Sequence, residues 1–175
     1  MTDEQLEQLR YPVGRFARLG RLTPALRKTL IQTIAETPAQ VREKVNNLSE
    51  SQLDTPYRPD GWTVRQVVHH MADSHLNSYI RFKWTLTEDE PLIKVYNQKA
   101  WAEMPEAAEG PVEYSLLILE GLHARWTDML NHMTDKDFEL KLTHPEQGKV
   151  DLDHMLALYA WHCRHHMAHI DLVAK

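Results

Sequence analysis

Apolar side chains recur every three to four residues in four long stretches of this sequence, and this spacing restricts the fold to packed helices. The stretches cover residues 24–48, 64–85, 112–134 and 151–172. Each stretch places an apolar stripe on one face of a helix, and such stripes pack against one another to form a core. A chain of 175 residues with 42% apolar side chains can bury one core of this kind. We therefore predict a single domain over residues 1–175.

Two of the predicted helix starts are marked by their capping residues. Thr23 precedes Pro24, which is the usual order of an N-cap followed by a proline at the first helical position. Thr63 is followed three residues later by a glutamine, which is the pattern of a capping box. Pro38 falls inside the first long helix, so we expect either a kink there or a second helical segment that starts at Thr37.

The connections between the helices complete the predicted topology. The link over residues 86–111 is long enough for the second and third helices to run parallel, and we expect its segment 96–101 to cover a functional site. Residues 138–152 alternate between apolar and polar side chains around a turn at 144–148, which predicts a small hairpin. The predicted fold class is all-α: a four-helix bundle with one long crossover between helices two and three and a small hairpin before helix four.

The scarcity of glycine and cysteine excludes several classes of functional site. The six glycines are never closer than six residues apart, whereas dinucleotide-binding and P-loop motifs need closely spaced glycines. The single cysteine, Cys163, excludes an intramolecular disulfide and a cysteine-rich zinc site, and it fits a reducing compartment. We find no membrane-length apolar segment and no signal peptide, so we expect a cytoplasmic protein without a membrane partner. A net charge of −5 argues against a nucleic-acid partner.

Four histidines lie on the inward arc of the last predicted helix. The apolar stripe of this helix continues onto His162, His166 and His169, and His165 lies on its shoulder. Burying several imidazoles side by side is costly unless something organises them, and a divalent metal does so through their lone pairs. His165 and His169 are four residues apart, the spacing of histidine pairs in helical zinc sites. The simpler alternative is a solvated helix end.

A third ligand should come from the second predicted helix, because a catalytic zinc commonly takes three protein ligands. The helical periodicity favours His75, which lies near the centre of the apolar stripe, whereas His70 lies on a polar shoulder. Each of them could also be a single hydrogen-bonded histidine without a metal. Asp73 and Arg164 are weak candidates for catalytic residues, as a base or ring-orienting group and as an anion-binding group.

Two segments, Asp60–His75 and Trp161–His169, resemble the signature of the YfiT-like candidate metal-dependent hydrolases of the DinB superfamily. Residues 51–58 and 122–127 are similar to the same family. The resemblance implies a DinB-like four-helix bundle that is usually a homodimer and binds one zinc or nickel ion per chain. It also implies His70, His165 and His169 as the metal ligands. Whether His75, His162 or His166 joins them stays open.

Three functions are compatible with such a site. In the first, a three-histidine divalent metal, with zinc ahead of nickel, activates water for hydrolysis of a small-molecule substrate. In the second, the metal activates a low-molecular-weight thiol, and the protein is a bacillithiol-like S-transferase acting on electrophiles. In the third, the chain is a metal-binding stress-response module without catalysis, of which a haem-binding bundle is a weaker version.

Overall fold

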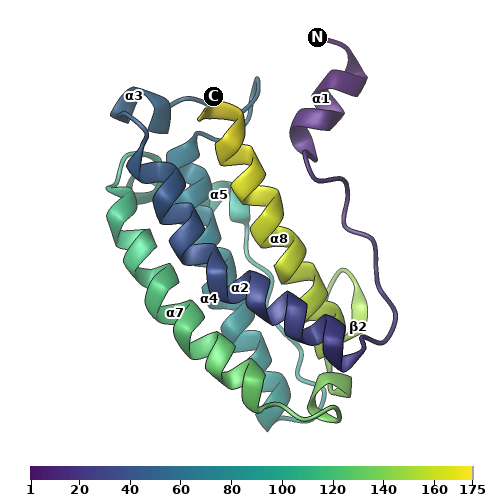
Figure 1. Cartoon of the computed structure of the whole chain (residues 1–175). Coiled ribbons are helices and arrows are strands. Elements are labelled where there is room, and N and C mark those ends of the chain that lie inside the picture. The colour runs from purple at the N-terminus through teal and green to yellow at the C-terminus, as the bar shows by residue number, and fades with distance from the viewer. Residues whose placement is uncertain (175) are drawn as a thin grey trace.

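Four long helices pack side by side in the computed structural model, which describes residues 1–174 (Figure 1). They are α2 (Pro24–Asn46), α4 (Val64–Thr87), α7 (Val112–His132) and α8 (Leu152–Val173). Helices α2 and α4 each pack against both α7 and α8, so the four surround a common core. Figure 1 shows α2 and α8 running in one direction and α4 and α7 in the opposite one. The predicted bundle, its long crossover and the parallel second and third helices are confirmed.

The long helices begin where the capping residues predict. The Thr23 hydroxyl accepts a hydrogen bond from the backbone N–H of Leu26, and Thr63 forms a complete capping box with Gln66. Helix α2 continues without interruption through Pro38, so the alternative of a second helical segment is wrong. The segment does not restart because the residue before the proline keeps its helical conformation, and its hydroxyl bonds back into the preceding turn.

Short elements connect the bundle. They are α1 (Asp3–Arg10), α3 (Glu50–Leu53), α5 (Gln98–Ala102), α6 (Pro105–Ala108), the 3-10 helix η1 (Asp137–Glu139), and the strands β1 (Lys141–His144) and β2 (Gly148–Asp151). The two strands pair antiparallel with Leu142 opposite Val150, which confirms the predicted hairpin. Helices α5 and α6 lie in the crossover and contact α4. Helix α1 stands beside the bundle in Figure 1 and buries none of its side chains.

The core is centred on Trp126, which is fully buried and packs edge-on against Phe82 and Tyr159 at ring distances of 5.6 and 5.5 Å. Cys163 is also fully buried in this core, and burial raises the pKa of its thiol to about 12. The thiol is therefore a packing group and not a nucleophile. None of the helices in residues 1–174 is both long and apolar enough to cross a membrane.

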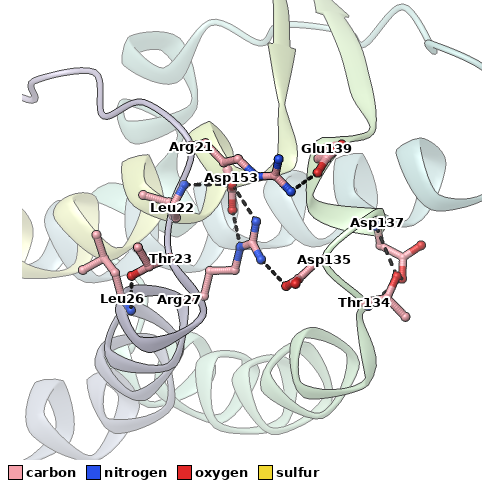
Figure 2. Close-up of polar contacts among 10 residues, drawn as sticks. All are labelled: Arg21, Leu22, Thr23, Leu26, Arg27, Thr134, Asp135, Asp137, Glu139 and Asp153. Carbon is pink, nitrogen blue, oxygen red and sulfur yellow. Dashed lines mark hydrogen bonds and ion pairs between the residues drawn. The ribbon is translucent and has the colours of Figure 1, made fainter.

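One buried ion pair ties the start of α2 to the start of α8 (Figure 2). The guanidinium of Arg27 donates from Nε and Nη2 to the two carboxylate oxygens of Asp153, at 2.6 and 2.9 Å. The backbone N–H of Leu22 donates to the same carboxylate at 3.0 Å. Asp135 pairs with the remaining side of the guanidinium, and Phe138 packs against its face at 4.6 Å. All polar atoms of this buried pair are thus supplied with partners from the chain itself.

Candidate metal centre

Helices α4 and α8 are antiparallel neighbours (Figure 1). Together they bring three histidines to one point. His162 and His166 lie one turn apart on α8 and face His70 on α4. One ring nitrogen from each lies within 4.8 Å of the others. The Nε2 atoms of His70 and His162 are 3.3 Å apart. Three imidazoles with converging nitrogens are the donor set that zinc and nickel accept.

A second, overlapping group consists of His165, His166 and His169, whose ring nitrogens also lie within 4.8 Å of one another. The structure therefore brings the predicted ligands His165 and His169 together, with ring centroids 4.3 Å apart. It groups His70 with His162 and His166 instead, so the predicted set of three spans two groups. His166 is the member that the two groups share.

The other histidines of α4 take different places. His69 faces α7, where its ring nitrogens bond Ser115 Oγ at 2.7 Å and the Gly110 carbonyl at 3.1 Å. His75 is fully buried, and its Nε2 contacts Nδ1 of His162, a member of the first histidine group. The polar shoulder of α4 thus faces the open site, while the centre of its apolar stripe lies in the closed core.

A chain of hydrogen-bonded rings leads from His162 into the core. His162 Nδ1 is 3.0 Å from His75 Nε2, His75 Nδ1 is 2.7 Å from His123 Nε2, and His123 Nδ1 is 2.6 Å from the carbonyl oxygen of Ile34. A carbonyl oxygen can only accept a hydrogen bond, so His123 donates from Nδ1 and accepts at Nε2. His75 must therefore donate from Nδ1 to His123, and His162 must donate from Nδ1 to His75. His162 therefore presents a lone pair at Nε2.

A shorter chain fixes the tautomer of His166. His169 Nε2 donates to the carbonyl of Arg10 at 3.2 Å, which leaves a lone pair on His169 Nδ1. His166 Nδ1 lies 3.3 Å from that atom and donates to it, so His166 also presents a lone pair at Nε2. Burial lowers the pKa of His169 to about 3, which keeps its ring neutral at physiological pH.

The neutral state extends to the third member of the group. Burial, together with the nearby positive charge that His165 can carry, lowers the pKa of His70 to about 4. A divalent metal needs neutral imidazoles whose far nitrogen is held by a hydrogen bond, and His162 and His166 meet both conditions. The residues present therefore fit a divalent ion.

The group opens into a cavity of about 840 Å³ between α4, α8 and the crossover. Aromatic rings form much of its wall: Tyr57 stacks on His169 at 3.9 Å, and Trp62 packs against His70 at 4.7 Å. Trp161 stacks on His165 at 4.4 Å. The crossover residues that also line the cavity are Gln98, Lys99 and Glu103. The crossover thus lies over the site, as the length of the link predicts.

The two weak catalytic candidates lie elsewhere. Within residues 1–174, the cavity lining includes neither Asp73 nor Arg164. Burial, and then the negative charge of Glu106, raises the pKa of Asp73 to about 6. Arg164 is exposed and borders a separate hollow with Asp171.

Two contributors to the site, His123 and Arg10, are not marked as functional residues by the spacing of the sequence. His123 is a lone histidine on the apolar face of α7, and Arg10 contributes through its backbone carbonyl. The pair His162 and His166 did carry a signal, because these residues are also four apart and lie on the predicted inward stripe. Spacing alone does not separate this pair from His165 and His169.

Comparisons with known proteins place the chain among relatives of the same fold. The family model of the DinB superfamily matches residues 33–170. A candidate metal-dependent hydrolase from Bacillus mycoides strain KBAB4 is 47% identical over 165 residues, which covers 94% of this chain and 95% of the relative. One from Bacillus cereus strain 03BB102 is 48% identical over 170 residues, covering 97% and 98%. The solved structure of YfiT from Bacillus subtilis, described as a probable metal-dependent hydrolase with an unusual four-helix bundle topology, matches with a TM-score of 0.92, 44% identity and 95% coverage of each chain.

Proposed function

This chain belongs to the DinB superfamily, and on that premise we propose that it is a metal-dependent hydrolase whose divalent ion is held by His70, His162 and His166. The observation that carries the proposal is the convergence of these three ring nitrogens at the floor of a cavity. The description of the relatives as metal-dependent hydrolases supports the same class of reaction.

The chemistry follows from the donor set. His70, His162 and His166 would hold a divalent ion without neutralising its charge, and the ion would supply Lewis-acid chemistry that lowers the pKa of water toward ~7. The protein's own groups prepare the site: the carbonyls of Ile34 and Arg10 hold the ligand rings in one tautomer. Stacked aromatic rings form part of the cavity wall.

We propose zinc as the physiological metal, with nickel as the alternative, because neutral imidazole nitrogens suit both ions. The predicted ligand set that includes His165 and His169 makes a competing claim on the same ion. In the competing set, His165 and His169 are the ligands in place of His162 and His166. Substitutions at these four positions therefore distinguish the two sets, because only a substituted ligand abolishes metal binding.

A thiol S-transferase is the second candidate function. A cavity of about 840 Å³ lies near the upper end of the ~300–1,000 Å³ range of small-molecule sites, so it has room for a thiol and an electrophile together. The thiol would be an external one, because Cys163 is fully buried in the core.

The experiment loads metal-stripped protein with Zn²⁺ or Ni²⁺, counts the bound ions, and assays 4-nitrophenyl acetate hydrolysis beside thiol consumption with a chlorinated nitroaromatic. We expect one ion per chain, loss of binding and hydrolysis in His162→Ala and His166→Ala, and retention in His165→Ala. The exposed His132→Ala is the matched control.

Each other outcome has a defined meaning. Loss of binding in His165→Ala but not in His162→Ala would replace the proposed ligands with the predicted ones. Metal-dependent thiol consumption without hydrolysis would make the protein a transferase. Metal binding without either activity would leave a non-catalytic module. The cytoplasmic location and the homodimer stay predictions, and sedimentation of the purified chain would test the latter.

A further inference from the structure

Pro38 lies inside α2 and leaves one backbone carbonyl without its helical partner. A proline has no N–H, so the carbonyl four residues earlier, that of Ile34, receives no bond from the next turn. His123 of α7 takes the vacant acceptor at 2.6 Å. A side chain from a neighbouring helix is thereby held by a main-chain atom that an uninterrupted helix would use itself.

We propose that His75 and His123 are positioning residues that order the proton on His162, so that its Nε2 lone pair faces the metal. This inference rests on the proposed function. His75 and His123 are 0% and 1% exposed, and the three contacts that link them to Ile34 and His162 measure between 2.6 and 3.0 Å. The Ile34 carbonyl fixes the proton position on His123, which fixes it on His75 and then on His162.

The opposite order of protons is excluded by its end point. If His162 carried its proton on Nε2, its Nδ1 would have to accept from His75, and His75 would have to accept from His123. The Nδ1 lone pair of His123 would then face the Ile34 carbonyl oxygen at 2.6 Å, with no hydrogen between them. Two lone pairs this close in a buried site repel each other, so one arrangement remains.

The test starts with nitrogen-15 NMR of the metal-free, unsubstituted protein, in which the two neutral tautomers of histidine give different cross-peak patterns. We expect His162, His75 and His123 to carry their protons on Nδ1. A proton on Nε2 of His162 would overturn the proposal without any variant. Correct tautomers in a protein that binds no metal would overturn the proposed function and leave the proton order in place.

Two variants of His123 then measure the effect on the metal. His123→Leu removes the bridge, and we expect Zn²⁺ affinity, measured by competition with a chelating dye, to fall about 10- to 100-fold. His123→Gln keeps a donor and an acceptor about as far apart as the ring nitrogens, so it should hold affinity within about threefold. Equal affinities in Leu and Gln variants, both folded by circular dichroism, would contradict the proposal.

A separate observation concerns Arg58, at the rim of the same cavity. Its Nη1 donates to the Pro59 carbonyl at 2.8 Å, its buried Nε has no hydrogen-bond partner, and within residues 1–174 its guanidinium forms no ion pair. The guanidinium lies 5.4 Å over the ring of Tyr57, which itself stacks on His169. Of the cations that are more deeply buried, Arg27 and Arg65 are paired with carboxylates, whereas Arg81 donates to the backbone carbonyl of Lys94.

The turn that carries Arg58 is built tightly. Asp60 adopts a positive φ of 55°, and the N–H of Gly61 donates to the Arg58 carbonyl at 3.0 Å. A Cβ on Gly61 would lie 2.7 Å from Cγ of Arg58, so only glycine lets the arginine pack over the turn. The turn therefore starts the Arg58 side chain at the rim of the cavity, where its guanidinium contacts the Pro59 carbonyl and the Tyr57 ring.

From this unpaired cation, the geometry points to a substrate that carries an anionic group, a carboxylate or a phosphate, bound by Arg58 beside the metal ligands. This inference also rests on the proposed function. A guanidinium binds either anion through paired hydrogen bonds, and Arg58 lines the cavity without a carboxylate partner among residues 1–174. Arg58 would then select among substrates and not take part in the bond cleavage.

The test uses inorganic phosphate as the probe on metal-free protein, so that no bound metal ion contributes to phosphate binding. We expect Arg58→Gln to weaken phosphate binding about 10- to 100-fold in calorimetry. Arg125→Gln is a matched control, because this arginine also lies over a tyrosine ring, at 5.6 Å, but outside the cavity. Equal phosphate affinity in wild type and Arg58→Gln would overturn the proposal.

A second measurement separates this inference from the proposed function. On zinc-loaded protein, Arg58→Gln should lower kcat/KM for the carboxylate-bearing mono-4-nitrophenyl succinate about 10-fold or more relative to 4-nitrophenyl acetate. Phosphate binding through Arg58 in a protein without hydrolytic activity would contradict the hydrolase and keep the anion site.

Discussion

The two ends of helix α8 bury polar groups in opposite ways. In its first turn, Asp153 is charged and meets the guanidinium of Arg27 and the N–H of Leu22 (Figure 2). Three turns later, His162 and His166 are neutral and meet only other rings on their inner side. Their outer nitrogens face the cavity.

The difference lies in whether the hydrogen-bond network is complete. Both carboxylate oxygens of Asp153 accept hydrogen bonds from Arg27 and Leu22. This network has its partners within the protein, so we assign it a structural role. The imidazole chains end on backbone carbonyls at one side, and at the other side on ring nitrogens that converge beside the cavity. A closed network indicates a structural role and an open one indicates a site.

The largest effect is expected from breaking the Asp153–Arg27 ion pair at the start of α8. Asp153→Ala leaves Arg27 buried without its main partner, and this should lower the free energy of unfolding by about 3–5 kcal/mol in urea titrations. Asp128→Ala is the control, since its pair with His132 is highly exposed, and we expect a change within ~0.5 kcal/mol. Equal losses in both variants would show that the buried pair has no special role.

Binding of a metal by the histidines of α4 and α8 should stabilise the folded protein by a somewhat smaller amount. Free Zn²⁺ at 100 times its dissociation constant raises the free energy of unfolding by about 2.7 kcal/mol if it binds only the folded chain. We expect the corresponding rise in Tm in wild type and none in His162→Ala. A Zn²⁺-dependent rise of the same size in His162→Ala would place the ion at other ligands.

Acid should destabilise the metal-free protein through its neutral rings. Burial lowers the pKa of His123 to about 4, against ~6.5 in the unfolded chain. The unfolded state therefore binds more protons than the folded state between these values, so stability falls as the pH drops below 6.5. His123 alone should cost about 2 kcal/mol at pH 5 relative to pH 8.

Urea titrations in the presence of a chelator would measure this slope, with His132→Gln as the exposed control. His123→Gln should flatten the slope, because the amide does not titrate. A metal-free protein whose stability does not change between pH 8 and 5 would contradict the buried, neutral state of the ring.

The smallest effect should come from Pro38→Ala. The new N–H competes with His123 for the Ile34 carbonyl, which weakens one neutral hydrogen bond, and we expect Zn²⁺ affinity to fall about 2- to 10-fold. Stability should rise, because a proline inside a helix costs more than an alanine. Affinity and stability that change in the same direction would argue against a role for the vacant carbonyl.

Local signals explain why the bundle could be predicted from the sequence. Apolar periodicity and the caps at Thr23 and Thr63 place all four long helices within two residues of their observed ends. These features depend on neighbours only a few positions away. The hairpin is predictable for the same reason, since its alternation and its turn lie in one short segment.

The choice of ligands is not local. His162 with His166 and His165 with His169 have the same spacing, and only the packing of α4 against α8 decides which pair faces His70. The hydrogen bonds that set the tautomers come from Ile34 and Arg10, which lie far away in the sequence. No pattern in the neighbourhood of the α8 histidines contains that information.

The carbonyl of Arg10 gives the N-terminal segment a role that its sparse packing conceals. Helix α1 buries no side chain, so trimming it looks harmless from the standpoint of the bundle. Yet the last residue of that helix receives the hydrogen bond from His169, and Gly14 receives another from Trp161. A shortened protein that begins at α2 would lose this carbonyl together with the Leu22 N–H that donates to Asp153, so loss of metal binding in such a truncation would not show that the full chain lacks a metal site.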